Sequence, residues 1–160
     1  GRLTVVRKGD LIELDFPSRA PAEVEVHAGL AGAMGGNPTE ILAARDYLVV
    51  YGTAAEVLAL RPDYGILMDV DRFAVIATAP GDDCDFVSRF FAPAQGIPED
   101  PVTGSAHCTL TPYWSKRLGK TQMMARQVSP RGGELWVEDR GDRVAIAGRC
   151  VLYLEGSITV

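Results

Sequence analysis

The sequence predicts an α+β domain in which a curved sheet surrounds one buried helix. Three observations support this prediction: short β-rich runs outnumber helical segments, hairpin-length turns separate several of these runs, and one long helical segment leaves little room for a polar face. A helix that is apolar nearly all round is a buried one. The length agrees with one domain, because 160 residues can enclose a core but are too few for two full domains.

Before residue 70 the sequence predicts short strands and short helices. Residues 3–16 contain two alternating β-rich runs on either side of residues 8–10, a pattern typical of a hairpin. A helix is expected over 53–60, because Thr53 followed three residues later by Glu56 forms a capping box. The other expected elements are a strand over 23–27, a helix over 28–34, a loop with some helical potential over 37–45, and strands over 46–51 and 65–68.

After residue 70 strands predominate around the main helix. That helix is expected at Gly104–Leu118, and Gly119 should close it. Pro112 removes one internal hydrogen bond and should bend it. The expected strands cover residues 73–78, 86–92, 123–128, 134–138, 144–147 and 150–154, and the last four form a meander.

Composition and charge exclude several classes of function. The net charge is −5 and no block of Lys or Arg forms a basic stripe, so nucleic acid is not an expected partner. No apolar run is long enough to span a bilayer, and residues 1–4 lack the regions of a signal peptide, so we expect a cytoplasmic protein without a membrane partner. Small molecules are the expected partners.

The three cysteines predict neither a metal nor a redox centre. Cys84, Cys108 and Cys150 are an odd number at wide spacing and form no CxxC pair. Isolated thiols of this kind are mostly small buried hydrophobes. We expect no metal site.

One short stretch, IPEDPVTGSAHC over residues 97–108, gathers the candidate functional residues. Asp100 precedes a proline, which favours extended geometry and places it in the loop before the helix. The backbone N–H groups at the helix start have no partner within the helix, and the macrodipole adds partial positive charge, so a carboxylate or phosphate could bind there. Gly104 would let a ligand approach the backbone, and Ser105 could donate a hydrogen bond or relay a proton.

A purely structural interpretation of the same stretch stays open. In that interpretation Thr103 or Ser105 caps the helix, Asp100 satisfies nearby amides and His107 points into the surrounding sheet. Clusters of Ser, Thr and Asp are common at helix starts for this reason alone. His107 and Cys108, inside an apolar helix, are expected to be packed rather than catalytic.

These residues also lie in a longer stretch that resembles a known family. Residues 85–120, DFVSRFFAPAQGIPEDPVTGSAHCTLTPYWSKRLGK, closely resemble the signature region of the PhzF family of phenazine-biosynthesis-like isomerases, which share the diaminopimelate epimerase fold. GDLIELDFP at 9–17, RPD at 61–63 and RGGELWV at 131–137 resemble that family's pattern in the same order. The resemblance covers essentially the whole chain.

The resemblance implies a specific fold. It implies two pseudo-symmetric halves, each a barrel-like and mostly antiparallel sheet wrapped around a central helix, with the active site between the two helix starts. Residues 1–160 would be a single domain equivalent to the second half, and Gly104–Leu118 would be its central helix. Residues 1–16 would form a hairpin that belongs to the first half in the family.

The resemblance also implies a chemistry. Asp100 and Ser105 match the catalytic positions, and Thr103, Gly104 and Ser105 match the positions that bind the substrate. The implied reaction is an isomerisation or epimerisation by proton transfer at a carbon of a small carboxylate metabolite, without a metal or other cofactor. Such a reaction requires a general base, an acid that returns the proton, and preorganised donors for the developing charge.

The chain differs from the family in one respect that determines which partners we expect. The first half, with its glutamate and histidine, has no match in the chain, so the chain is expected to be a fragment or to have found replacement contacts. A homodimer that brings two copies of Asp100 together, or a separate polypeptide that supplies the first half, would complete the site. The alternative is a catalytically inactive half-protein that binds a small anion or only assembles.

Overall fold

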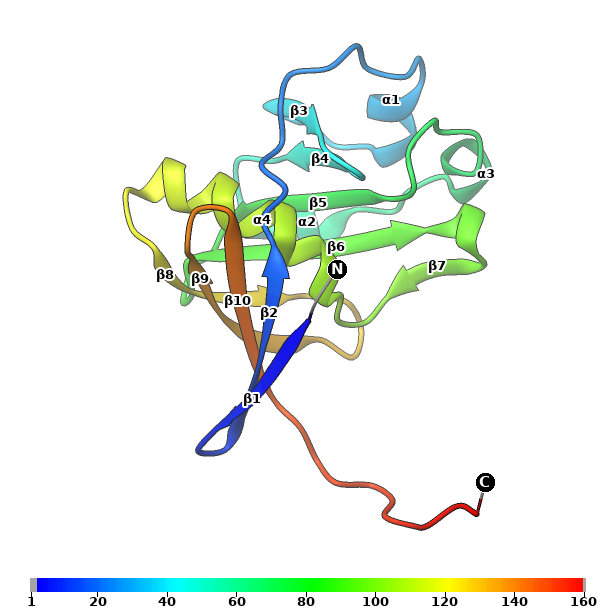
Figure 1. Ribbon diagram of the computed structural model, residues 1–160. Helices are drawn as coiled ribbons and strands as arrows, with labels where there is room; N and C mark the ends of the chain where they lie inside the picture. Colours follow the sequence, from blue (N-terminus) through cyan, green and yellow to red (C-terminus); the bar gives the residue numbers. More distant parts are fainter. Residues whose placement is uncertain (1–2, 160) are drawn as a thin grey trace.

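The chain forms one ten-stranded sheet and four helices in the computed structural model, which describes residues 3–159 (Figure 1). The strands are β1 (Thr4–Lys8), β2 (Leu11–Pro17), β3 (Glu40–Ala43), β4 (Tyr47–Val50), β5 (Val75–Pro80), β6 (Phe86–Ala92), β7 (Ile97–Asp100), β8 (Gln122–Gln127), β9 (Gly133–Asp139) and β10 (Arg143–Arg149). The helices are α1 (Leu30–Met34), α2 (Ala54–Ala59), α3 (Tyr64–Leu67) and α4 (Gly104–Leu118), with a short 3-10 turn at Pro93–Gln95.

The sheet curves without closing. Its strands follow the order β1-β2-β10-β9-β8-β6-β5-β4-β3, and β7 adds to β6 outside this path. Most neighbours are antiparallel, whereas β4–β5 and β6–β8 are parallel. The α+β prediction of a curved, mostly antiparallel sheet around one helix is confirmed.

The central strands β4, β5 and β6 are buried on both faces, so the sheet separates two apolar cores. Successive side chains of a strand point to opposite faces, which assigns alternate residues to the two cores. One core contains Leu48, Ile76 and Phe90 and faces α4, while the other contains Val49, Val75 and Phe91 and faces the three short helices. Helix α4 also packs against β2, β8, β9 and β10.

The bounds of the long helix are those predicted. Gly119 ends it with a φ of 68°, a left-handed conformation that favours glycine. Pro112 lacks the N–H that would bond to the carbonyl of Cys108, and the backbone N–H of Arg19 donates to that carbonyl instead, at 2.9 Å. Trp114 stacks on Phe86 with ring centroids 5.6 Å apart, which anchors the helix on the sheet.

Two of the strands predicted before residue 70 are wrong. Residues 23–27 form no strand, and the isolated bridge to Ala43 is made by Ala22, just before this segment. Residues 65–68 lie instead at helix α3 and its end. Asp63 starts this helix, because its side chain accepts hydrogen bonds from the next amides and so satisfies donors that a helix start leaves open.

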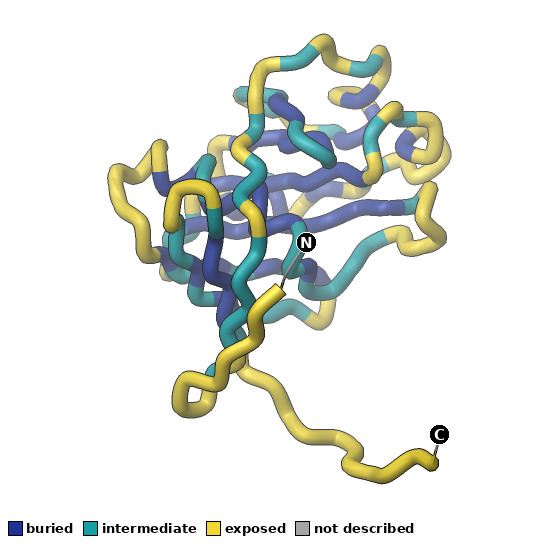
Figure 2. The backbone as a smooth tube through the Cα atoms, in the orientation of Figure 1, coloured by how far each residue is buried: buried dark blue, intermediate teal, exposed yellow. Residues whose placement is uncertain are grey.

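Three further differences concern strand assignment. Strand β3 replaces part of the loop expected over 37–45, because its residues pair antiparallel with all of β4. Strand β7, which ends at Asp100, has no counterpart among the predicted strands. The strand predicted over 150–154 is absent, because residues 150–159 run away from the sheet without pairing (Figures 1 and 2).

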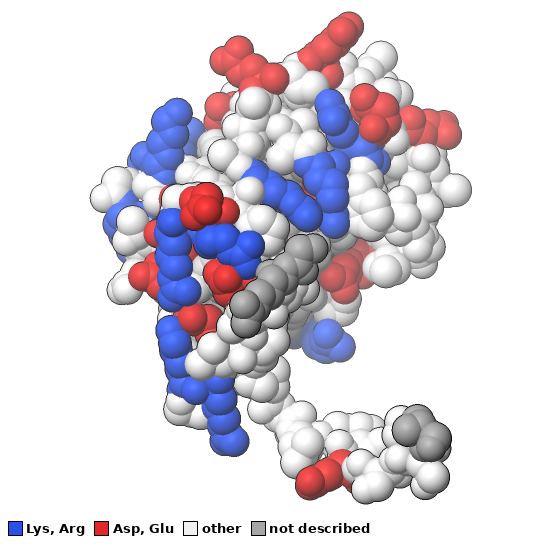
Figure 3. Space-filling model, in the orientation of Figure 1, with Lys and Arg blue, Asp and Glu red and all other residues white. Residues whose placement is uncertain are grey.

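Exposed apolar residues gather at both ends of the chain. Every residue of β1 is exposed, and Val5 retains 61% of its accessible surface. Tyr153 in the projecting tail is 98% exposed, and the tail carries a single charged side chain, Glu155 (Figure 3). The rest of the face in Figure 3 shows basic and acidic side chains interspersed.

The cysteines occupy three different environments. Cys108 is buried, as expected, whereas Cys84 is partly buried and Cys150 is exposed, so the expectation of a buried thiol fails there. All three are free thiols. Among residues 3–159 no helix has the length and apolar character needed to cross a bilayer.

Candidate functional site

Asp100 lies at the last position of β7, directly before the loop that leads into α4. Its backbone pairs with Phe90 of β6, so the extended geometry expected before Pro101 is part of the sheet edge. The neighbouring Glu99 accepts two hydrogen bonds from Arg89, at 2.7 and 2.8 Å, and both side chains are largely buried. This bidentate pair fixes β7 against β6 and thereby fixes the position of Asp100.

Thr103 occupies the N-cap position of α4 but does not cap the helix with its side chain. Its hydroxyl instead donates to Oδ2 of Asp100, at 2.5 Å. Within residues 3–159 the other carboxylate oxygen of Asp100 accepts no hydrogen bond. The capping role of Thr103 in the structural interpretation is therefore wrong, and Asp100 keeps one oxygen available to a ligand.

Gly104 and Ser105 form the first positions of α4 and are half-buried. A Cβ placed on Gly104 would meet no atom within 4 Å, so open space lies in front of the first helical residue. Among the residues that the structure describes, no side chain caps this helix start. Its backbone N–H groups and the helix dipole are thus available to a negatively charged group.

The hydroxyl oxygen of Ser105 accepts a hydrogen bond from the guanidinium of Arg45, at 3.3 Å. Arg45 is itself held by Asp46, at 3.1 and 3.3 Å, and lies 4.2 Å from the ring centroid of Phe73. Burial raises the pKa of Asp46, although the hydrogen bond from Arg45 opposes this effect. Because Arg45 donates to Ser105, the proton of the Ser105 hydroxyl must point toward another acceptor.

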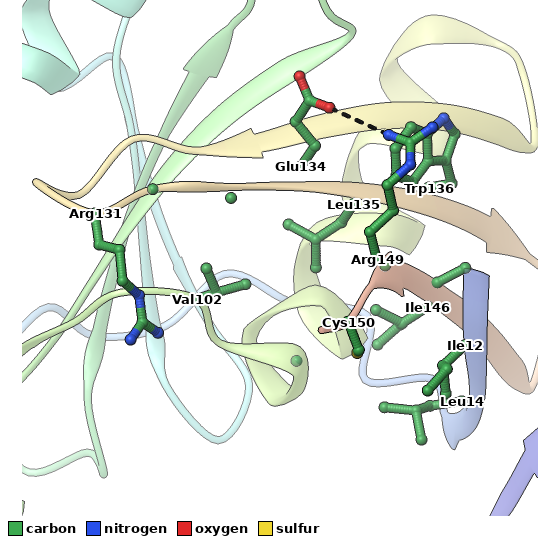
Figure 4. A pocket seen from close by; sticks show the side chains of 15 residues that line it. Ile12, Leu14, Val102, Arg131, Glu134, Leu135, Trp136, Ile146, Arg149 and Cys150 are labelled. Atoms are coloured by element: carbon green, nitrogen blue, oxygen red, sulfur yellow. Dashed lines mark ion pairs between the residues drawn. The ribbon is translucent and has the colours of Figure 1, made fainter. Parts of the chain in front are cut away.

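The helix start opens onto a pocket of about 500 Å³ inside the curve of the sheet (Figure 4). Its lining is mainly apolar and comes from β2, β9, β10 and the helix start: Ile12, Leu14, Val102, Gly104, Leu135 and Ile146. Arg149 lies at its edge, where it stacks on Trp136 at 4.7 Å and pairs with Glu134. Gly104 lines this pocket, whereas Asp100 does not.

His107 and Cys108 lie inside the protein, as expected. His107 has no exposed surface, and its Nδ1 lies 2.8 Å from the carbonyl oxygen of Thr103. Burial lowers the pKa of His107 to about 4, so the ring is neutral at pH 7 and Nδ1–H is the donor in this contact. Burial raises the pKa of the Cys108 thiol, which therefore stays protonated and is a poor nucleophile.

Gln127 is a site residue that the sequence analysis did not single out. It ends β8, is 1% exposed, and makes three hydrogen bonds to the loop before α4. Its Nε2 donates to the backbone oxygen of Asp100 at 2.6 Å and to the hydroxyl of Thr103 at 3.1 Å. Its Oε1 accepts from the backbone N–H of Thr103 at 2.7 Å. A glutamine at a strand end carries no local signal for such a role.

The fold is the one found in solved PhzF-family proteins. A PhzF-family phenazine biosynthesis protein of Enterococcus faecalis superposes with a TM-score of 0.90 at 41% identity, over 98% of this chain and 60% of that chain. A putative phenazine biosynthesis PhzC/PhzF protein from Clostridium difficile superposes with a TM-score of 0.89 at 41% identity, over 100% and 62% of the two chains. The class is therefore that of PhzF-like α+β proteins.

Sequence comparison identifies the family. The PhzC-PhzF family of phenazine biosynthesis-like proteins matches residues 7–156, and the chain belongs to it. An uncharacterized isomerase of Pseudomonas aeruginosa is 49% identical over 159 residues, which cover 99% of this chain and 61% of that protein. An uncharacterized isomerase of Halalkalibacterium halodurans is 39% identical, with the same two shares. The chain thus spans about three fifths of the length of these relatives.

Proposed function

We propose that this chain supplies one wall of a PhzF-type isomerase site. In that site a proton moves between a carbon atom of a small carboxylate metabolite and a carboxyl group of the protein. The observation that carries the proposal is the pairing of a carboxylate with an uncapped helix start. Asp100 has one oxygen without a hydrogen bond among the described residues, and the first turn of α4 begins four residues later. Relatives named as isomerases add support.

The proposed roles follow from the contacts of each group. Asp100 accepts or returns the proton through the oxygen that Thr103 leaves open, as a general acid–base group. The amides at Gly104 and Ser105 bind the carboxylate of the metabolite and stabilise the negative charge that develops when the proton leaves carbon. Ser105, whose oxygen accepts from Arg45, directs its own proton toward the bound anion. These roles require neither a metal nor another cofactor.

The same proposal requires a second wall. Glu99, the carboxylate next to Asp100, is held by Arg89 and so does not provide a second proton-transfer group. We therefore infer that a partner completes the site, either a second copy of this chain or a polypeptide equivalent to the remaining part of the relatives. In a twofold homodimer two Asp100 carboxylates would face each other, and like charges so placed would repel.

Solvent proton exchange tests the proposal. The chain is incubated in D₂O with a panel of small unsaturated, hydroxy and amino carboxylates, and NMR measures deuterium at carbon. Exchange is expected with wild type and should fall at least a hundredfold in Asp100→Asn. Asp142→Asn, at an exposed carboxylate in the β9–β10 turn, is the matched control and should leave the rate unchanged. An equal rate in wild type and Asp100→Asn would contradict the role of Asp100.

Light scattering coupled to size exclusion separates the two forms of the proposal. A dimer would support the facing Asp100 pair, and a crystal structure with the two carboxylates far apart would exclude it. A monomer would favour a separate polypeptide, which is then added to the exchange assay.

A binding function without catalysis is the second candidate. Proton transfer needs both an acid and a base, whereas of the neighbouring carboxylates Glu99 and Asp100 only Asp100 is not held by Arg89. A single available carboxylate therefore favours binding without catalysis. In that case calorimetry would detect a small carboxylate, Gly104→Ala would weaken its binding, and no carboxylate in the panel would exchange a proton with or without a partner.

A further inference from the structure

We propose that Gln127 is a positioning residue that decides which oxygen of Asp100 is free for proton transfer; this inference rests on the proposed function. Gln127 comes from β8 and is 24 residues from Thr103 in the sequence. Its backbone belongs to the sheet, whereas within residues 3–159 all the hydrogen bonds of its side chain go to Asp100 and Thr103. Its side chain is therefore committed to the loop that carries the candidate site.

The orientation of the carboxamide is fixed by its partners. The backbone N–H of Thr103 can only donate, so it must meet the oxygen of the carboxamide, and the backbone oxygen of Asp100 can only accept, so it must meet the nitrogen. A flipped carboxamide would place donor against donor and acceptor against acceptor. Gln127 therefore presents one defined N–H to the hydroxyl of Thr103.

That N–H sets the direction of the next hydrogen bond. The oxygen of Thr103 accepts from Gln127 at 3.1 Å, so its own proton is free to point at Oδ2 of Asp100, 2.5 Å away. A carboxylate oxygen that accepts a short hydrogen bond is a poorer base than its neighbour. Through Thr103, Gln127 thus keeps Oδ2 occupied and leaves Oδ1 as the oxygen that exchanges a proton.

The turn after β8 supports the same loop from the side. The hydroxyl of Ser129 donates to the carbonyl of Pro101 at 2.7 Å. Gly133 lies so close to the loop that an added Cβ would come within 2.5 Å of the Val102 side chain. Residues 100–103 are therefore each in contact with β8, the following turn or the start of β9, and Gln127 bonds to the first and the last of them.

Two substitutions separate the contacts of Gln127. Gln127→Leu keeps a similar volume and removes all three hydrogen bonds. A carboxyl group in Gln127→Glu still accepts from the Thr103 N–H but has at most one proton to donate, so it cannot supply both the Asp100 carbonyl and the Thr103 hydroxyl. Gln122→Glu, at an exposed residue of the same strand, is the matched control.

NMR tests the proposal without a substrate. Amide exchange at Thr103 should be about tenfold faster in Gln127→Leu and unchanged in Gln127→Glu, because only the first loses the acceptor. The carboxyl carbon signal of Asp100 should move in both variants and stay in place in Gln122→Glu. An unmoved Asp100 signal in a folded Gln127→Glu protein would overturn the proposal. That variant decides the test if Gln127→Leu fails to fold.

The exchange assay adds a second readout. With a carboxylate that wild type deuterates, Gln127→Glu should lower kcat about tenfold or more and leave KM within about twofold, because the anion-binding amides are untouched. A change in KM alone would contradict the positioning role. If wild type deuterates no carboxylate either alone or with the separate polypeptide added, the proposed function fails, while the NMR result still decides whether Gln127 orients Asp100.

Discussion

The clearest test of the buried helix is acidification, because the first turns of α4 contain one fully buried histidine. His107 is fully buried and its pKa is lowered from 6.5 to about 4, chiefly by burial. Below pH 6.5 the unfolded chain takes up a proton at this histidine that the folded protein cannot take up. The free energy of unfolding must therefore fall as the pH decreases from 6.5, and the loss is complete below about pH 4.

The size of the effect follows from the two pKa values. Each pH unit between them costs about 1.4 kcal/mol, so His107 removes about 3 kcal/mol of stability across this window. This is a large part of the 5–15 kcal/mol that is typical of a folded domain. No such loss occurs above pH 6.5, where the histidine is neutral in both states.

Urea denaturation at a series of pH values measures this effect. His107→Gln retains an N–H that can reach the carbonyl of Thr103 but has no titratable group, so the stability difference between wild type and this variant should shrink by about 3 kcal/mol from pH 7 to pH 4. His27→Gln is the control: it retains His107, so its free energy of unfolding should show the same loss from pH 7 to pH 4 that His107 causes in wild type. A difference between wild type and His107→Gln that stays constant over this range would refute the argument.

Three further substitutions test the site and its supports. Gly104→Ala places a methyl group in open space, so the free energy of unfolding should stay the same or rise by up to about 1 kcal/mol. Calorimetry should show weaker binding of small carboxylates to this variant. Unchanged binding would contradict an anion site there. Glu99→Gln should lower stability by about 3 kcal/mol in urea, because Arg89 is left buried without its charge partner; a loss below about 1 kcal/mol would contradict that pairing. Thr53→Ala should cost about 1 kcal/mol by removing the capping box of α2, and an unchanged urea midpoint would contradict that cap.

Local patterns predicted the elements whose structure is decided locally. The bounds of α4 follow from an apolar segment that ends at a glycine, and Gly119 indeed adopts the left-handed conformation that such an ending favours. The capping box at Thr53 is present as predicted. The hairpin over 3–16 forms because its alternating residues pair around a turn in which Gly9 has a positive φ.

The wrong assignments come from short segments that tertiary contacts decide. Residues 40–43 lie in a segment whose local sequence predicts a loop with some helical potential, yet they pair with β4 at the sheet edge. Residues 65–68 read equally well as strand or helix, and the cap from Asp63 decides for the helix. The exposed tail after Arg149 shows that an apolar run becomes a strand only when a neighbouring strand is available to pair with it.

Some residues of the candidate site could be predicted from the sequence, and others could not. Asp100, Gly104 and Ser105 stand within six residues, so the expectation of a proline-fixed carboxylate before a helix start could be drawn from the sequence. Gln127 contacts Thr103 from 24 residues away in the sequence, and Arg45 contacts Ser105 from 60 residues away. No periodicity or motif connects such distant residues, because their proximity depends on the order of the strands in the sheet.

The contacts of Thr103 bear on the two interpretations of this stretch. A threonine at an N-cap position normally satisfies an amide of its helix, and giving up that bond costs about 1 kcal/mol. Here the hydroxyl is turned to Asp100 by the N–H of Gln127, and the helix amides remain without a side-chain cap at a half-buried, open surface. Local preferences of this kind are usually overruled where a site needs the geometry. The uncapped start of α4 is therefore what the proposed anion-binding role requires.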